Sequence, residues 1–218
     1  MKSFAVKELG LLDYQKAWQI QLETHAAVAR GELSPTLLLV EHPAVITFGK
    51  KGGRENLLVR EDFLLEKGFS LYDIERGGDI TYHGPGQLVG YPIFNVGRNV
   101  QWYLRTLEQV MVDTLSDFGF SSEGSPGYAG VWVNGEKIVS IGVAIKRNVS
   151  FHGFAFNVST NLAHFNYIVP CGLVGKQMTS LEKLLAKPVT LEDVKEKLLD
   201  HMHHHFAKSQ SLSSKVAG

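Results

Sequence analysis

The stretch Arg76-Gly77-Gly78-Asp79-Ile80-Thr81-Tyr82-His83-Gly84-Pro85-Gly86-Gln87 decides how this chain is organised. Its four glycines, proline, histidine and arginine cannot form a core. Glycine permits a positive φ and lets the main chain approach another molecule closely. The apolar runs on either side, 69–74 and 88–94, predict strands that hold the stretch rigid. We therefore expect a loop that wraps around a ligand or lies against a facing strand.

Composition and charge favour one soluble globular domain over residues 1–218, with a flexible tail at 209–218. The chain is 44% hydrophobic and 20% charged, and no linker or low-complexity tract divides it. Lysine plus arginine number 22, as do aspartate plus glutamate, so no overall field would attract nucleic acid or an anionic membrane. We expect neither as a partner.

The N-terminal residues and the cysteine count predict a cytoplasmic location. Residues 1–18 are interrupted by charges and lack the apolar region of a signal peptide, and no run of eighteen apolar residues occurs. Cys171 is the single cysteine, which excludes an intramolecular disulfide and a multi-cysteine zinc site. A reducing compartment is the default for such a chain.

Hydrophobic spacing predicts an α/β sandwich with a mixed, largely antiparallel sheet and helices packed on it. The predicted elements are helices at 13–30 and 104–118, the second ended by Gly119; strands at 36–42, 45–48 and 151–158; an Asn134-Gly135 hairpin; and late helices opened by Thr179 with Glu182 and by Thr190 with Asp193. Strands and helices do not alternate regularly, which argues against a doubly wound fold.

Cys171 is the candidate nucleophile. A lone cysteine in such a protein is more often a small core residue, but Pro170 and Gly172 place this one in a turn, which presents a side chain. A thiol attacks as the thiolate, so a base or cation must lie nearby. Lys137, His83 and His152 are the candidates.

Four blocks of sequence together resemble one known family. They are Arg76-Gly77-Gly78 with Thr81 to Gln87, Lys137-Ile138 with Ser140-Ile141-Gly142, His152 to Val158, and Pro170-Cys171-Gly172. In this order and at these intervals they resemble the lipoyl(octanoyl) transferases, also called lipoate-protein ligase B, of the biotin and lipoate protein ligase superfamily. The resemblance extends from about Leu37 to Leu184.

The resemblance implies an activity and partners. The family moves an octanoyl group from octanoyl-acyl carrier protein to a lysine of lipoyl domains, in 2-oxoacid dehydrogenase complexes and the glycine cleavage H protein. The reaction passes through an acyl thioester on the cysteine matched by Cys171. Lys137 matches the lysine that lowers the pKa of that thiol and moves the proton. The resemblance implies no cofactor and no metal.

The resemblance also implies which residues line the acyl site. The substrate-binding set is Arg76, Gly77, Gly78, Asp79, Ile80, Thr81, Tyr82, His83, Ser140, Ile141, Gly142, Gly153, Phe154 and Ala155, with Gly84, Gln87 and His152 in supporting positions. Exchange between thioesters and attack by an amine need no nucleotide, and the chain has no P-loop. Backbone N–H groups near Ile141 or Gly172 could form an oxyanion hole.

Three other functions remain open at this point. Cys171 with His83 or His152 could form a Cys-His thioester hydrolase, in which water takes the acyl group. Related enzymes pass octanoyl groups between lipoyl domains by the same chemistry. The chain could also be a non-catalytic binding module on a ligase-like scaffold.

The other histidines give weaker signals. His201, His203, His204 and His205 resemble a metal cluster, but only His201 and His205 share a helix face, with no carboxylate evident beside them. We expect no metal there. His25, His42 and His164 lack any context in the sequence.

Overall fold

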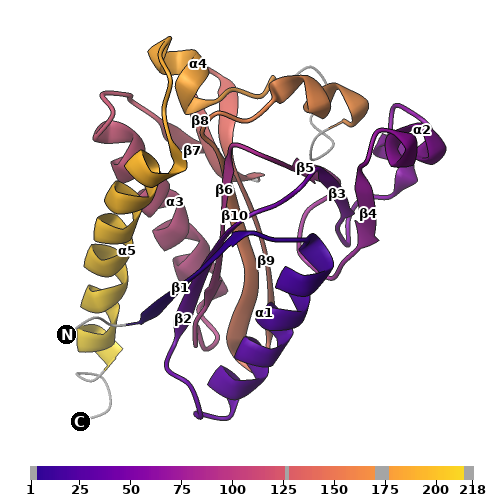
Figure 1. The fold of residues 1–218 in the computed structure, drawn as a ribbon. Coiled ribbons are helices and arrows are strands. Elements are labelled where there is room, and N and C mark those ends of the chain that lie inside the picture. The colour runs from indigo at the N-terminus through magenta and orange to yellow at the C-terminus, as the bar shows by residue number, and fades with distance from the viewer. Residues whose placement is uncertain (1–3, 126–127, 170–176, 214–218) are drawn as a thin grey trace.

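A seven-stranded mixed sheet forms the centre of the molecule in the computed structural model, which describes residues 4–125, 128–169 and 177–213 (Figure 1). Its strands run in the order β1-β2-β6-β10-β9-β8-β7. Only β1 and β2 pair in parallel, and the other neighbours are antiparallel. The α/β fold class with a largely antiparallel sheet is therefore confirmed. The strand bounds are β1 (Ala5–Leu11), β2 (Thr36–Glu41), β6 (Gln87–Ile93), β7 (Glu123–Ser125), β8 (Tyr128–Val133), β9 (Glu136–Lys146) and β10 (Val149–Asn157).

A second, three-stranded sheet lies beside the first, in the order β4-β3-β5. Its strands are β3 (Val45–Phe48), β4 (Ser70–Asp73) and β5 (Thr81–His83). The strand β5 belongs to the glycine-rich stretch, so the prediction that this whole stretch is a loop is wrong at residues 81–83. These residues pair with β3, where Thr81 lies opposite Thr47 and His83 opposite Val45. Threonine and tyrosine fit a half-buried pleated surface, which explains why the stretch becomes a strand here.

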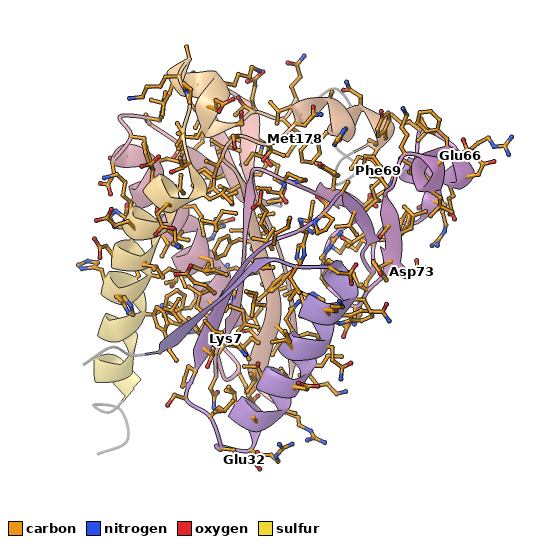
Figure 2. All side chains as sticks on the ribbon, viewed as in Figure 1. Lys7, Glu32, Glu66, Phe69, Asp73 and Met178 are labelled. Atoms are coloured by element: carbon orange, nitrogen blue, oxygen red, sulfur yellow. The ribbon has the colours of Figure 1, made fainter. Side chains whose placement is uncertain are left out.

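Helices cover both faces of the main sheet (Figure 1). The helical segments are α1 (Tyr14–Ala29), α2 (Glu61–Glu66), α3 (Val100–Ser116), α4 (Leu181–Leu185) and α5 (Leu191–Ser213), with short 3-10 helices η1 (Arg54–Asn56) and η2 (Leu162–Tyr167). The largest apolar cluster joins the main sheet to α3 and α5, and a second joins β2, β6 and β10 to α1. In Figure 2 the side chains fill both spaces, and Phe69 and Met178 mark a third cluster beside the small sheet. Within the described residues, no helix combines the length and apolar character of a membrane span.

The predicted helix starts are mostly confirmed. Asp13 caps α1 by accepting from the backbone N–H groups of residues 15 and 16. Thr190 and Asp193 form the predicted reciprocal cap of α5, since each side chain accepts from the other residue's backbone N–H. Thr179, however, is not the cap of α4. Ser180 takes that place, since its side chain accepts from Lys183 N, and the backbone N–H of Thr179 is bonded to Lys137 O.

The predicted hairpin is confirmed and brings Lys137 to the start of a central strand. Asn134 and Gly135 have φ angles of 51° and 80° between β8 and β9, as a type I′ turn requires. Lys137 follows two positions later and pairs with Trp132 across the hairpin.

Two glycines let the backbone of neighbouring strands and a covering loop come close together. Gly142 on β9 lies directly opposite Gly153 on β10. A Cβ on Gly142 would stand 2.9 Å from Gly77 O, and one on Gly153 would stand 2.1 Å from Gly90 O. Any side chain at these positions would force the strands or the loop apart.

Replacing Gly153 with alanine should therefore destabilise the fold. The added methyl meets the backbone of β6, which no side-chain rotation can relieve, and overpacking of this kind costs about 1–3 kcal/mol. The measurement is urea unfolding followed by circular dichroism. The matched control is Gly68→Ala, where φ is +82° but no atom lies within 4 Å of the new Cβ, so only the backbone conformation is strained. A loss no larger than that of the control would contradict the steric explanation.

Candidate active site

A pocket of about 460 Å³, including the open space at its mouth, lies between the main sheet and the glycine-rich segment. One wall comes from β6, β9 and β10, and the facing wall from residues 76–83 together with Tyr14 at the start of α1. The lining residues are Tyr14, Arg76, Gly77, Gly78, Thr81, His83, Val89, Tyr91, Ser140, Ile141, Gly142, His152, Gly153, Phe154 and Ala155. Segments far apart in the sequence thus meet around one volume.

The loop at residues 76–78 is held on the sheet from two sides. Gly77 N donates to Val143 O of β9 at 2.8 Å. The buried guanidinium of Arg76 donates through Nη2 to the backbone oxygen of Thr47 on β3 at 2.8 Å and to its hydroxyl at 3.0 Å. The loop is therefore a fixed wall that joins the two sheets, and Arg76 serves as the clamp.

The histidines around the pocket are buried and neutral at pH 7. Burial, with a smaller contribution from the neighbouring His42 ring, lowers the pKa of His83 to about 3. Burial lowers the pKa of His42 to about 4. His42 makes 2.7 Å hydrogen bonds to Leu12 O and to the hydroxyl of Tyr91, so it supports the pocket wall from behind. A wall of uncharged rings suits an apolar ligand.

His152 enters the pocket from an unusual backbone position. It has a φ of 54°, although β10 continues through it, and its backbone N–H donates to the side chain of Gln21 on α1 at 3.0 Å. Its Nε2 lies 3.6 Å from Glu75 Oε2. Burial lowers the pKa of His152, while Glu75 opposes that shift. The left-handed backbone turns the ring toward the pocket and Glu75.

Lys137 is only 2% exposed, a burial that is rare for lysine. Its Nζ lies 4.9 Å from the centre of the Trp132 ring, and its backbone bonds to residues 177 and 179. It precedes Ser140 of the pocket wall by three positions on β9, about 10 Å at the rise of a strand. A Cβ on Gly130 would stand 2.7 Å from Lys137 Cε, so the glycine makes room for the lysine stem. Lys137 is thus buried, but it is not one of the residues that line the pocket, and its catalytic role stays a prediction.

Cys171, with Pro170 and Gly172, lies outside the residues that the structure describes. The described chain resumes at Gln177, whose carbonyl accepts from Lys137 N at 2.9 Å. The predicted meeting of the thiol with Lys137 therefore stays a prediction.

Most of the expected substrate-binding residues lie on the pocket wall. Arg76, Gly77, Gly78, Thr81, His83, the segments 140–142 and 153–155, and His152 all contribute to it. Asp79, Ile80 and Tyr82 do not. Asp79 accepts from Asn56 and from Ile80 N, while Ile80 and Tyr82 pack into the cluster behind the small sheet. Gly84 and Gln87 also lie off the wall.

Some residues at the site were not found from the sequence. Tyr14 was predicted only as part of the helix at 13–30, and Val89 and Tyr91 only as part of the strand at 88–94, yet all three line the pocket. His42 and Glu75 do not line the pocket but contact residues that do, His42 through the Tyr91 hydroxyl and Glu75 through the His152 ring. An apolar spacing pattern cannot distinguish a pocket wall from a core, so no sequence signal marked them.

The C-terminal histidines pair with carboxylates that the sequence did not reveal. His201 Nε2 lies 2.9 Å from Asp117 Oδ2, and His205 Nε2 lies 2.6 Å from Asp113 Oδ2, both across the contact between α3 and α5. The expectation that no carboxylate accompanies them is wrong, because the partners come from a different helix. Among the described residues, no group of three or more possible ligands is close enough for a metal ion.

A pocket bounded by a fixed loop and the main sheet defines a candidate ligand-binding site in an α/β domain, and comparison with known proteins identifies the kind of domain. The model of the lipoyl protein ligase A/B catalytic domain matches residues 13–203. An octanoyltransferase of Caldicellulosiruptor saccharolyticus is 44% identical over 95% of this chain and 90% of its own length. One from Deinococcus radiodurans is 49% identical over 99% of this chain and 69% of its own.

Solved structures share the fold at low sequence identity. Protein Ta0514 from T. acidophilum, solved with bound lipoic acid, superposes with a TM-score of 0.76 at 16% identity, covering 94% of this chain and 86% of that one. A bipartite lipoate protein ligase from Thermoplasma acidophilum, described with its E2 lipoyl domain, gives 0.74 at 17% identity, covering 94% and 84%. The chain thus belongs to the lipoyl protein ligase A/B catalytic-domain family and, within it, to the octanoyltransferases. It is an acyltransferase enzyme.

The buried neutral histidines predict how stability depends on pH. A folded-state pKa of about 4 at His42, below the unfolded value of about 6.5, means that the unfolded chain binds more protons between these values. The free energy of unfolding should therefore decrease as the pH falls from 7 to 5, by on the order of 1 kcal/mol for this ring. His42→Gln, which does not titrate, should weaken that dependence in urea unfolding measured across this range.

A measurement at pH 8 is the internal control for this prediction. There His42 is neutral in both states, so the difference between wild type and His42→Gln reports only the altered hydrogen bonds. Equal slopes between pH 7 and 5 in the two proteins would contradict the assignment.

Proposed function

We propose that this chain transfers an octanoyl group from octanoyl-acyl carrier protein to a lysine of lipoyl domains, as a step of lipoate biosynthesis. Cys171 carries the acyl group as a thioester, and Lys137 takes and returns the proton. The acceptors are the lipoyl domains of 2-oxoacid dehydrogenase complexes and the glycine cleavage H protein. Residues 1–218 act as one catalytic domain in the cytoplasm, without a cofactor.

The placement of Lys137 beside the pocket is the observation that carries this proposal. Lys137 is buried on the same strand that supplies Ser140, Ile141 and Gly142 to the pocket wall. Gln177, which follows Cys171 by six positions, hydrogen-bonds to Lys137. The octanoyltransferase names of the relatives support octanoyl as the group that is transferred. The ligase described with its E2 lipoyl domain supports a lipoyl domain as the acceptor.

The proposed reaction has two balanced half-steps. In the first, Lys137 as the neutral amine takes the proton of the Cys171 thiol, the thiolate attacks the carrier thioester to form the enzyme thioester, and the carrier sulfur leaves and takes that proton back from Lys137. In the second, the amine of the acceptor lysine attacks the enzyme thioester, an amide forms, and the Cys171 thiol is restored. The first step exchanges one thioester for another, and the second releases free energy because an amide is more stable, so no nucleotide is consumed.

Intact mass spectrometry tests the proposed roles directly. Wild-type enzyme mixed with octanoyl-acyl carrier protein should gain the mass of one octanoyl group, and Cys171→Ala should gain none. Lys137→Met should slow both half-reactions by at least about 100-fold, as expected for the loss of a proton-transfer group. Lys146→Met, at the exposed far end of the same strand, is the matched control and should react like wild type.

The acyl-enzyme also separates the alternative functions. Addition of a lipoyl domain should move the octanoyl group onto its lysine, whereas a hydrolase would release octanoic acid at the same rate with or without that domain. An octanoyl-lipoyl domain offered as donor tests transfer between lipoyl domains. An unaltered adduct on Cys171→Ala would refute the thioester intermediate.

A further inference from the structure

A chain of buried amide groups connects the pocket to the strand that carries Lys137. His83 Nδ1 lies 2.8 Å from Gln87 Oε1, and Gln87 Nε2 lies 2.8 Å from Asn157 Oδ1. Asn157 Nδ2 lies 3.0 Å from Thr179 O. Gln87 and Asn157 are each 1% exposed. We call His83, Gln87, Asn157 and Thr179 the amide relay.

The backbone carbonyl of Thr179, at the end of the amide relay away from the pocket, determines which group donates in each of its hydrogen bonds. Thr179 O is a backbone carbonyl and can only accept, so Asn157 must turn its NH₂ toward it and its oxygen toward Gln87. Gln87 must then donate from Nε2 to Asn157, and the same nitrogen faces a second carbonyl, Tyr82 O, at 3.3 Å. Gln87 Oε1 is left as an acceptor for the His83 ring.

This direction sets the tautomer of His83. Because Gln87 Oε1 cannot donate, the proton of the neutral ring must reside on Nδ1, and Nε2 keeps its lone pair. Within the described part of the chain, Nε2 has no hydrogen-bond partner, and the ring belongs to the pocket wall. The pocket therefore presents one hydrogen-bond acceptor whose orientation is set by residues outside it.

The other end of the relay holds the backbone of Lys137. Thr179 N donates to Lys137 O at 2.9 Å, and Lys137 N donates to Gln177 O at 2.9 Å. Asn157 thus fixes, through residue 179, the segment to which both backbone groups of Lys137 are bonded. The Asn157 side chain is therefore connected by hydrogen bonds to His83, through Gln87, and to the backbone of Lys137, through Thr179.

We propose that Gln87 and Asn157 are positioning residues of the transfer reaction: they hold His83 as the Nδ1–H tautomer, so that Nε2 accepts a hydrogen bond from an N–H group of the substrate, and they fix the backbone of Lys137. The part that concerns the substrate rests on the proposed octanoyl transfer. Burying two amide side chains is costly unless their hydrogen bonds are made. In the amide relay each of these side chains has hydrogen-bond partners on both its oxygen and its nitrogen.

Nitrogen NMR on the ¹⁵N-histidine-labelled full chain tests the tautomer without any activity measurement. In wild type, His83 should show a protonated Nδ1 and an unprotonated Nε2. Gln87→Met removes the acceptor, so the ring should shift toward the Nε2–H form. Asn157→Leu leaves only the 3.3 Å bond to Tyr82 O to orient the Gln87 amide, so it should produce a mixture of both forms.

Thr114→Val is the matched control for the loss of a buried hydrogen bond. Its hydroxyl donates to Val110 O within α3 at 2.8 Å, away from the pocket, so the His83 signals and the transfer rate should not change. Urea unfolding of all variants shows that each is folded under the assay conditions. A His83 ring protonated on Nε2 in wild type would overturn the proposal.

Kinetics of octanoyl transfer supply the second readout. Gln87→Met and Asn157→Leu should lower kcat by about tenfold to 100-fold, with a smaller change in KM, because misplacing reacting groups affects the transition state more than binding. If the tautomer shifts but kcat is unchanged, the positioning role is wrong. If wild type shows the expected tautomer yet transfers no octanoyl group, the proposed function fails while the hydrogen-bond assignment stands.

Discussion

The contact on which the site depends is the close approach of the loop at residues 76–78 to β9 at Gly142 and Val143. Gly77 N reaches Val143 O at 2.8 Å because no side chain on Gly142 separates them. The same approach closes the pocket over the sheet. A pocket wall held by backbone contacts has little freedom to rearrange, so its shape is set before any ligand arrives.

The small sheet acts as a support for that loop rather than as a separate unit. Arg76 bonds to Thr47 on β3, and β5 continues the same stretch into a strand that pairs with β3. The guanidinium must be buried to make this bond, and burial of a cation is tolerated only where its hydrogen bonds are made. The loop and the small sheet therefore keep their positions together.

Electrostatics divide the site into two parts. Around the pocket, His42, His83 and His152 are buried and have lowered pKa values, so these rings carry no charge at neutral pH. Beyond the pocket, Lys137 lies against the Trp132 ring, at the start of the strand that lines it. The strand β9 carries both Lys137 and the lining residues Ser140 to Gly142, so it determines the spacing between the lysine and the pocket wall.

The sequence by itself determined the local elements and the family. The Asn134-Gly135 turn, the caps at Asp13 and Thr190, and the apolar strands follow from short-range backbone preferences, and four motif blocks were specific enough to indicate the octanoyltransferases. Only the tertiary structure decided that Tyr14, Tyr91 and Glu75 surround the pocket, that Thr81 to His83 form a strand, and that Asn157 connects His83 to Lys137. These relations depend on which strands become neighbours, and residues 87 and 157 meet because β6 pairs with β10. Local patterns carry no information on that pairing, because the same alternation of apolar residues fits many sheet orders.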